Sequence, residues 1–223
     1  MKVVAIIQAR MGSTRLPGKV LADLGGRPAL AWTVRAAGAV PGIDRAVVAT
    51  SEAAADDAVA KWCEDAGVPC HRGPEDDVLA RYHMAARAEG AETIMRLTAD
   101  CPLLDPMVCG EVLMLLEREG ADYASNVDPR SWPDGLDCEV FTAATLDAAA
   151  AEAESPMERE HVTPFMGRAF HTWVLKNPHE HGNINMRWTI DTPEELEFAR
   201  EVYAKLYAEN PVFGYSAMRE SGY

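Results

Sequence analysis

Three cations and a serine stand close together in a loop near the N-terminus, between Gln8 and Lys19. Glycine in such a loop lets backbone N–H groups approach phosphate oxygens, and a hydroxyl adds a neutral donor. Guanidinium and ammonium groups balance the charge that develops on a departing pyrophosphate. The segment therefore predicts a site for a nucleoside triphosphate. The residues of these types in the segment include Arg10, Gly12, Ser13, Arg15 and Lys19.

The two common phosphate-binding loops do not match this segment. Five residues separate Gly12 from Gly18, where a Walker loop has four, and Val20 stands where that loop has serine or threonine. No G-x-G-x-x-G run occurs in the chain. The alternative to a triphosphate site is a basic surface loop without a ligand.

Two aspartates, Asp100 and Asp191, each follow a predicted strand and form a second candidate site. Magnesium commonly uses one or two protein carboxylates and fills its octahedral shell with water and substrate phosphate. Each aspartate also has an ordinary alternative role as a turn or helix cap, since Asp191 precedes a Thr-Pro step. From the residues alone capping is favoured, although one carboxylate can both cap a helix and bind a metal.

A third group of polar side chains is suited to holding an acidic acceptor. An arginine can clamp a carboxylate in bidentate fashion, and carboxylates can accept hydrogen bonds from hydroxyl groups. The alternative is a turn and a charged helix face at a subunit contact. A general-base role is not assigned to the histidine, because phosphoryl transfer depends mainly on positioning and charge. The candidate residues are Asp134, Arg159, Glu160, His161 and Arg187.

An alternation of strands and helices must position these groups. It favours an α/β fold with a mostly parallel sheet covered on both faces, and with ligands outside the carboxyl ends of the strands. Strands are expected at 2–9, 45–50, 68–71, 93–97 and 122–126, and helices at 29–40, 53–66, 78–89 and 106–119. An aspartate N-cap and a proline at the first position open the helix at 106–119.

Turn residues interrupt this alternation after Asn126, and we expect an excursion over about 127–140. With 223 residues, 48% of them hydrophobic, the chain suits one domain over 1–223. After the excursion we expect helices at 143–154, 158–168 and 193–208, and strands at 171–175 and ending at 190–191. The run His179-Glu180-His181 is interpreted as a solvated turn rather than a zinc site, because it lacks H-E-x-x-H spacing.

The charge and the cysteines limit the possible partners and the compartment. The formal net charge of −14 would repel a nucleic-acid backbone or an anionic membrane, although residues 1–35 hold six cations against one aspartate. The five cysteines form no C-x-x-C pair and are expected to be reduced thiols. Without a signal segment or a membrane span in the sequence, we expect a cytoplasmic protein that binds neither nucleic acid nor membrane.

The loop resembles the signature of the cytidylyltransferases that activate sugar acids. That family is typified by 3-deoxy-manno-octulosonate and acylneuraminate cytidylyltransferases, and the chain is most similar to its spore-coat polysaccharide branch. The resemblance covers nearly the whole chain. It is carried by the segments 8–19, 49–51, 75–82, 96–102, 133–137, 159–163 and 187–193.

This resemblance implies a three-layer α/β/α fold like that of the nucleotide-diphospho-sugar transferases, which is Rossmann-like, with a mixed sheet. It implies transfer of CMP from CTP to a sugar acid, release of pyrophosphate, and a homodimer formed through a protruding arm at 127–140. Mg²⁺ would be held by Asp100 and Asp191, and Arg81 and Thr98 would lie near the nucleobase. The other implied nucleotide-binding residues are Gln8, Ala9, Arg10, Gly12, Ser13, Arg15, Lys19 and Ser51, and the catalytic set is Arg10, Lys19, Asp100 and Asp191.

Two alternatives stay open at this point. A metal-dependent glycosyltransferase of the related fold would use a nucleotide sugar as donor, but its usual Asp-x-Asp motif is absent from the sequence. A non-catalytic nucleotide-binding subunit would have lost site residues that are present here. The acceptor and the preference for cytosine are also open, because the stretch 96–99 lacks the glutamine that the octulosonate enzymes place beside the base.

Overall fold

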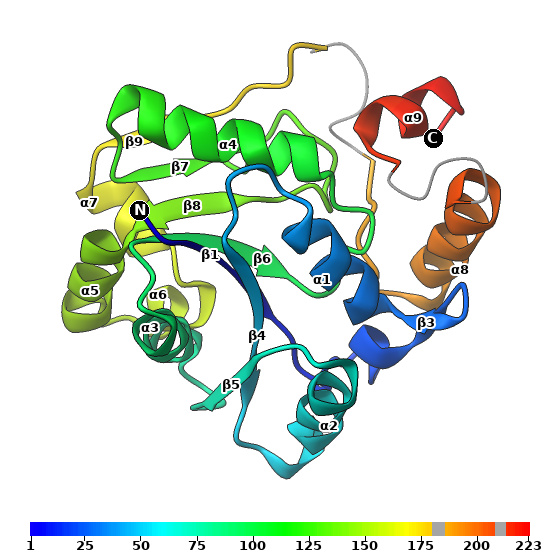
Figure 1. Ribbon diagram of the computed structural model, residues 1–223, viewed down its shortest axis with the longest axis horizontal. Coiled ribbons are helices and arrows are strands. Elements are labelled where there is room, and N and C mark those ends of the chain that lie inside the picture. The colour runs from blue at the N-terminus through cyan, green and yellow to red at the C-terminus, as the bar shows by residue number, and fades with distance from the viewer. Residues whose placement is uncertain (180–185, 208–212) are drawn as a thin grey trace.

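A seven-stranded sheet forms the centre of the protein, whose computed structural model describes residues 1–179, 186–207 and 213–223 (Figure 1). The strands are β1 (Val3–Gln8), β4 (Arg45–Ser51), β5 (Cys70–Gly73), β6 (Thr93–Thr98), β7 (Tyr123–Ser125), β8 (Glu139–Thr142) and β9 (Thr172–Val174). Their order across the sheet is β5-β4-β1-β6-β8-β7-β9. β8 is antiparallel to both β6 and β7, whereas the other neighbours are parallel. The mixed sheet is therefore confirmed.

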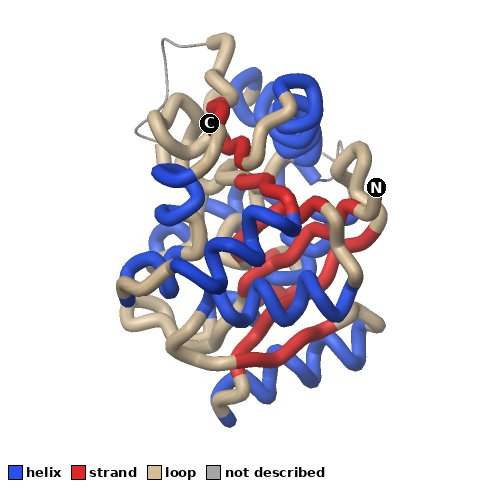
Figure 2. The backbone as a smooth tube through the Cα atoms, turned by 90° about the vertical axis from the view of Figure 1, so that its left-hand side faces the viewer, coloured by secondary structure: helices blue, strands red, loops and turns tan. Residues whose placement is uncertain are grey.

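Helices cover both faces of this sheet, as the two views in Figures 1 and 2 show. One face carries α1 (Ala29–Gly38), α2 (Asp57–Ala66) and α4 (Pro106–Glu119), and the other carries α3 (Val78–Glu89), α5 (Ala143–Glu152) and α7 (Pro164–Ala169). Alternate residues of β1 point to opposite faces, so that Ile7 packs into the first layer and Ile6 into the second. The predicted three-layer α/β/α architecture is confirmed.

A third hydrophobic cluster attaches the C-terminal part of the chain to this core. It contains Trp32 of α1, Trp188, and Tyr203. The segments that contribute to it or lie next to it are α8 (Pro193–Val202), a π-helical turn (Tyr203–Tyr207), α9 (Tyr215–Glu220) and the short hairpin of β2 (Asp23–Leu24) and β3 (Arg27–Pro28). This packing brings the C-terminal segment beside the N-terminal part of the chain.

Local capping signals fix several helix boundaries. Asp105 caps α4, because its Oδ1 accepts hydrogen bonds from the backbone of Met107 at 2.7 Å and of Val108 at 3.3 Å. Asp77 caps α3 in the same way through Ala80 N. Both helices have the bounds predicted from the sequence, 78–89 and 106–119.

The segment expected to form an excursion over about 127–140 ends in a strand that the sequence analysis did not predict. Its end forms β8, which pairs with β6 and β7 inside the sheet. Trp132, Leu136 and Cys138 are buried, so these residues of the segment pack into the fold. The sequence analysis missed this strand because it has only four residues and directly follows a stretch of turn residues.

Several other boundaries differ from the sequence predictions. The strand expected at 68–71 begins at Cys70, because Val68 N still bonds to Cys63 O at the end of α2. The helix expected at 158–168 is two helices, α6 (Pro156–His161) and α7, separated by a turn at Val162. Of the stretch before Asp191 the structure describes residues 186–190, which form the bridge from Asp134 to Arg187 and no named strand. The helix expected to end at Ala208 changes to a π-helical turn at Tyr203, and Ala208 lies outside the described residues.

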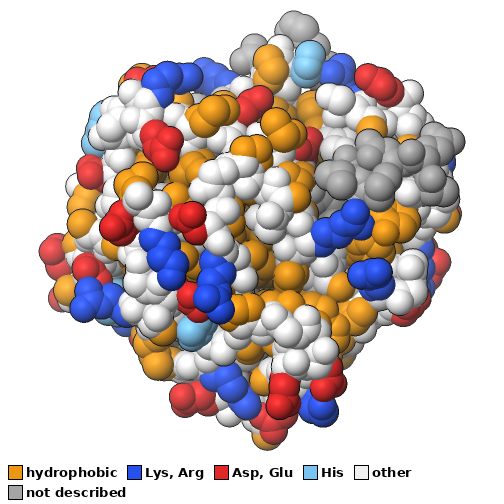
Figure 3. Space-filling view, viewed as in Figure 1, with side chains coloured by type: hydrophobic (Ala, Val, Ile, Leu, Met, Phe, Trp, Pro, Cys, Tyr) orange, Lys and Arg blue, Asp and Glu red, His pale blue; other side chains and the backbone are white. Residues whose placement is uncertain are grey.

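The surface carries charges of both signs. On the face shown in Figure 3, lysine and arginine side chains lie among aspartate and glutamate side chains, with hydrophobic side chains between them. Among the described residues, no helix combines the length and the apolar character needed to cross a membrane.

Candidate active site

Lys19 lies between the two aspartates that were predicted to hold a metal. Its Nζ is 2.7 Å from Asp100 Oδ2 and 2.7 Å from Asp191 Oδ1. Gly18 has a φ of 73° and begins the short 3₁₀ turn Lys19–Leu21, which directs the lysine back toward the carboxyl end of β6. The structure thus brings residues from three distant parts of the sequence within hydrogen-bond distance of one another.

Backbone contacts bring Asp191 to this place. Ile190 N donates to Asp100 O at 2.8 Å, and Trp188 N donates to Asp134 O at 2.6 Å. Gly135 makes the second contact possible, because a Cβ there would lie 2.6 Å from the carbonyl carbon of Trp188. The segment before Asp191 therefore lies directly against the turn that follows β6.

Asp191 is not the N-cap of α8. Thr192 is the N-cap of α8, where its hydroxyl accepts from Glu195 N in a capping box. The Asp191 carboxylate faces cations instead: Lys19, Arg15 at 3.0 Å and Arg187 at 2.8 Å. The carboxylate of Asp100 likewise contacts Lys19 and, within the described residues, caps no helix.

These contacts shift the ionisation of the groups involved. Burial acts to raise the pKa of Asp191, but the hydrogen bond and charge of Lys19, with Arg15 and Arg187, hold that pKa below its usual range. Burial acts to lower the pKa of Lys19, but Asp100 and Asp191 raise it overall. Asp191 is therefore a carboxylate and Lys19 an ammonium ion at neutral pH.

The two carboxylates fit a magnesium site. They already flank one cation, the Lys19 ammonium group, which marks a place where positive charge is stabilised. No group of three or more possible metal ligands occurs among the described residues. Two carboxylates suffice for Mg²⁺ when substrate phosphate and water complete the shell.

A cavity of about 410 Å³ opens beside Lys19, and its volume is typical of small-ligand sites. The N-terminal loop, the end of β6 and α6 contribute to its lining. The lining residues are Gln8, Arg10, Gly12, Ser13, Thr14, Arg15, Lys19, Val20, Thr98, Ala99, Asp100 and Glu160. Most of the residues predicted to bind a triphosphate thus share one cavity.

Arg81 lies beneath this region and is completely buried. Its Nη1 donates to Pro74 O at 2.9 Å, and Arg10 Nη1 donates to the neighbouring Glu75 O at 3.1 Å. Burial and the charge of Arg10 lower the pKa of Arg81. Among the described residues, nothing accepts a hydrogen bond from Arg81 Nε or Nη2, or donates one to Gln8 Oε1. Gln8 is among the residues that line the cavity, whereas Arg81 is not.

Ser51 and Ala9 do not line the cavity. Ser51 is buried and donates its hydroxyl hydrogen bond to Asp56 Oδ2, while Asp56 Oδ1 accepts from Met11 N at 2.6 Å. Ser51 therefore supports the N-terminal loop from behind. Asp56 was missed by sequence reasoning; its position just before α2 resembles an ordinary acidic helix terminus.

The residues predicted to hold the acceptor are only partly brought together. Arg187 contacts three carboxylates: Asp134 at 2.9 Å, Asp191 at 2.8 Å and Glu195 at 2.9 Å. Burial raises the pKa of Asp134, and Asp137 adds to that shift. Arg187 therefore joins Asp134 to the Asp191 carboxylate.

The other three residues predicted to hold the acceptor, Arg159, Glu160 and His161, belong to α6. Glu160 lines the cavity, and His161 is exposed at the end of the helix. Arg159 donates from Nε to Asp77 Oδ2 at 2.7 Å and from Nη1 to Ala153 O at 3.0 Å, which ties it to α3 rather than to the cavity. The structure places Arg159 in a supporting position.

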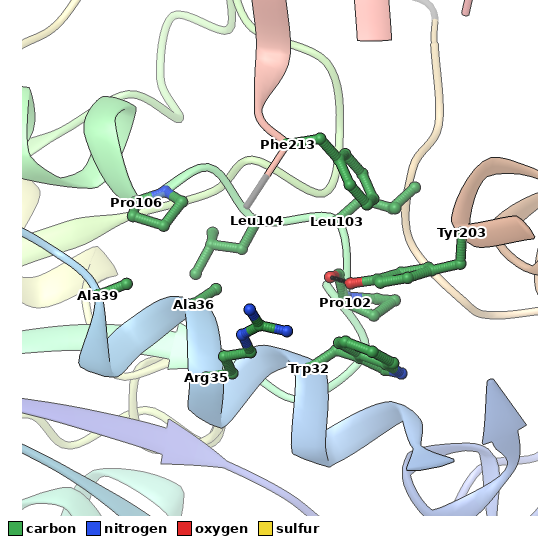
Figure 4. Close-up of a pocket in the computed structure, with 10 residues that line it drawn as sticks. All are labelled: Trp32, Arg35, Ala36, Ala39, Pro102, Leu103, Leu104, Pro106, Tyr203 and Phe213. Carbon is green, nitrogen blue, oxygen red and sulfur yellow. Dashed lines mark hydrogen bonds between the residues drawn. The ribbon is translucent and has the colours of Figure 1, made fainter. Parts of the chain in front are cut away.

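A second, smaller cavity lies apart from these groups (Figure 4). Its volume is about 40 Å³, and Arg35 is the only charged group among the described residues that line it. Trp32 and Arg35 of α1 face Leu104, Tyr203 and Phe213 across it. It is too small for a nucleotide, so the chemistry is assigned to the cavity beside Lys19.

Comparison with known proteins agrees with this geometry. The sequence profile of the cytidylyltransferases matches residues 4–217. The chain belongs to the cytidylyltransferase family. This cytidylyltransferase is 34% identical to the spore coat polysaccharide biosynthesis protein SpsF of Bacillus subtilis, over 91% of this chain and 87% of that protein.

Two further relatives extend the comparison. The 3-deoxy-manno-octulosonate cytidylyltransferase of Anaeromyxobacter dehalogenans is 32% identical over 91% of this chain and 98% of its own length. The solved structure of a cytidylyltransferase from Leptospira borgpetersenii superposes with a TM-score of 0.91 at 31% identity, over 99% of this chain and 93% of that one. The family assignment favours nucleotidyl transfer over the glycosyltransferase alternative.

Proposed function

We propose that this cytidylyltransferase transfers CMP from CTP to a sugar acid in a magnesium-dependent reaction that releases pyrophosphate. The observation that carries the proposal is the position of Lys19, between Asp100 and Asp191 and on the wall of the loop cavity. One side of this arrangement offers cations to phosphate oxygens, and the other offers carboxylates to a metal.

The N-terminal loop holds the triphosphate in this proposal. Arg10, Arg15 and Lys19 neutralise phosphate oxygens, and the hydroxyl of Ser13 and the backbone at Gly12 add neutral donors. As pyrophosphate departs, the same cations stabilise its growing negative charge without moving far. Asp56 keeps the loop in place through Met11 N.

Asp100 and Asp191 would hold Mg²⁺ next to these phosphates. The chemistry that Mg²⁺ would supply there is neutralisation of phosphate oxygens, which would make the α-phosphorus more electrophilic. An acceptor oxygen then attacks that phosphorus in line with the leaving pyrophosphate, and the protein contributes mainly position and charge. No residue needs to form a covalent intermediate.

The buried groups around Arg81 suit recognition of the nucleobase. Arg81 Nε and Nη2 and Gln8 Oε1 find no partner among the described residues, and Thr98 lies on the cavity wall beside Gln8. A pyrimidine offers both acceptors and donors to such groups. Cytosine as the base is part of the proposal.

A sugar acid is proposed as the acceptor because of the charges around the metal-binding carboxylates. Arg187 can attract a carboxylate, and Asp134 and Glu160 can accept hydrogen bonds from sugar hydroxyls. Relatives named for octulosonate and for a spore-coat polysaccharide support this class of acceptor. We further propose that the enzyme acts as a homodimer in the cytoplasm, where its five free cysteines would stay reduced.

The test is a pyrophosphate-release assay with Mg²⁺, in which each of the four nucleoside triphosphates is combined with sialic, octulosonic, legionaminic and pseudaminic acids. We expect release with CTP and at least one acid. A preference for another triphosphate would contradict the assignment of the base. Absence of release with every pair, together with no effect of CTP on the melting temperature, would contradict the proposed reaction.

A further inference from the structure

Val162 has a backbone conformation that β-branched residues rarely adopt. Its φ is 71° and its ψ is −54°, and Thr163 N donates to His161 O at 2.8 Å across it. These values define a classic γ-turn, which is rare and strained in proteins. Positive φ is especially unfavourable for a β-branched residue such as valine. Val162 is also fully buried, so contacts with the surrounding residues must stabilise the turn.

A buried polar network supplies those contacts. Thr163 Oγ1 donates to Glu139 Oε1 at 2.6 Å, which ties the turn to strand β8. The same oxygen accepts from Tyr123 OH at 2.7 Å, and Arg96 pairs with the other carboxylate oxygen. Glu139, Tyr123 and Thr163 are each less than a tenth exposed, so these charge-assisted bonds are shielded from water.

Glu160 stands close to this turn. Glu160 lies two residues before Val162 and lines the loop cavity, whose other described lining residues come from 8–20 and 98–100. A carboxylate here would repel the triphosphate, so it suits a hydroxyl group of the acceptor. Arg159, bound to Asp77, restrains the same helix from its other side.

We propose that Thr163 is a positioning residue for the acceptor: through Glu139 it fixes the strained turn at Val162 and thereby places the Glu160 carboxylate on the cavity wall. This inference rests on the proposed function for the identity of the acceptor. The contact of Thr163 with Glu139 does not depend on it.

The first experiment compares Thr163→Val with Tyr123→Phe, because each variant removes one hydroxyl donor to the same Glu139 oxygen. Both should lower the melting temperature by similar amounts. Thr163→Val should also speed amide hydrogen exchange at the end of α6 by about tenfold, the loss expected for one hydrogen bond, and Tyr123→Phe should not. Thr163→Ser, which keeps the hydroxyl, should restore slow exchange. Equal exchange in the valine and phenylalanine variants would overturn the proposal.

The second experiment uses the sugar acid that gives pyrophosphate release. Thr163→Val should raise the KM for that acid about tenfold and leave the KM for CTP within about twofold. In a Glu160→Ala background the same substitution should have no further effect on the acid, because coupled residues are non-additive. Additive effects, or a parallel rise in both KM values, would overturn the proposal.

The two experiments separate the possible failures. If no acid supports pyrophosphate release, the proposed function fails, while hydrogen exchange still decides whether Thr163 holds the turn. If release occurs but Thr163→Val has the same amide hydrogen exchange as Tyr123→Phe, the positioning role fails and the proposed function stands.

Discussion

Lys19 and Asp191 are 172 residues apart in the sequence, and a 2.7 Å hydrogen bond joins Lys19 Nζ to Asp191 Oδ1. Asp100 receives a second bond of the same length from the same ammonium group. A buried or half-buried cation between two carboxylates balances charges that would otherwise repel each other. The pair thus joins the predicted phosphate loop to the predicted metal site.

Replacement of Asp191 by asparagine should remove turnover with little loss of stability. The amide binds Mg²⁺ poorly, and we expect kcat to fall by about a hundredfold or more. Thr192→Ala is the matched control, because it removes the actual cap of α8 and should cost about 1 kcal/mol of stability with kcat retained. Steady-state rates and thermal unfolding measure both variants, and near-normal turnover in Asp191→Asn would contradict the metal assignment.

Lys19→Met should change the binding of metal and nucleotide in opposite directions. In the free protein the Lys19 ammonium group neutralises the carboxylates of Asp100 and Asp191. Its removal leaves their negative charge unbalanced, so Mn²⁺ should bind the free protein more tightly. CTP should bind more weakly, because the triphosphate loses a cation. Electron paramagnetic resonance for Mn²⁺ and calorimetry for CTP give the two affinities. Lys61→Met, on the exposed face of α2, should change neither.

Asp56→Ala should weaken CTP binding although Asp56 does not line the cavity. The substitution removes the acceptor of Met11 N and the partner of Ser51, so the phosphate loop loses its support. A rise of about tenfold in the KM for CTP is expected from one charge-assisted bond. Asp57→Ala removes only an exposed ion pair with Arg72 and serves as the control. Similar KM values for the two variants would count against the loop-support role.

Gly135→Ala should disturb the active site from outside it. The new Cβ would lie 2.6 Å from Trp188 C and 2.9 Å from Thr189 N, and Gly135 also has a φ of 112°. The segment that carries Asp191 must therefore move, and the variant should lose more than about 2 kcal/mol of stability together with activity. Gly26→Ala has a φ of 83° and no neighbour within 4 Å, so it should cost only about 1 to 2 kcal/mol. Denaturant unfolding distinguishes them, and equal losses would show that strain alone matters.

Stability should fall in acid partly through Glu89. Burial acts to raise its pKa, but the hydrogen bond from His71 at 2.8 Å and the charges of Arg45 and Lys2 lower it overall from 4.5. Since the folded pKa is the lower one, the contribution is complete above pH 4.5 and is lost as pH falls through the folded value. Glu89→Gln should therefore reduce the free energy of unfolding at pH 7 and flatten its decline below pH 4.5. An unchanged acid slope in urea titrations would contradict this.

Features that depend on neighbouring residues were predictable from the sequence. The caps of α3 and α4 lie within one helical turn of the residues they serve, so Asp77 and Asp105 fix those boundaries locally. The cations of the N-terminal loop are likewise close in sequence, and a strand delivers them together to the cavity. That these loop residues lie together could therefore be predicted from the sequence.

Other features were decided by which strands and helices meet in space. Only the sheet places the four residues of β8 between β6 and β7, because such a short run has no periodicity of its own. The break at Val162 depends on Glu139, and the capture of Arg159 depends on Asp77, 82 residues away. The sequence by itself determined the chemical groups and their local order. The tertiary structure decided which charges face each other, because a carboxylate binds whichever cation the packing brings within hydrogen-bond distance.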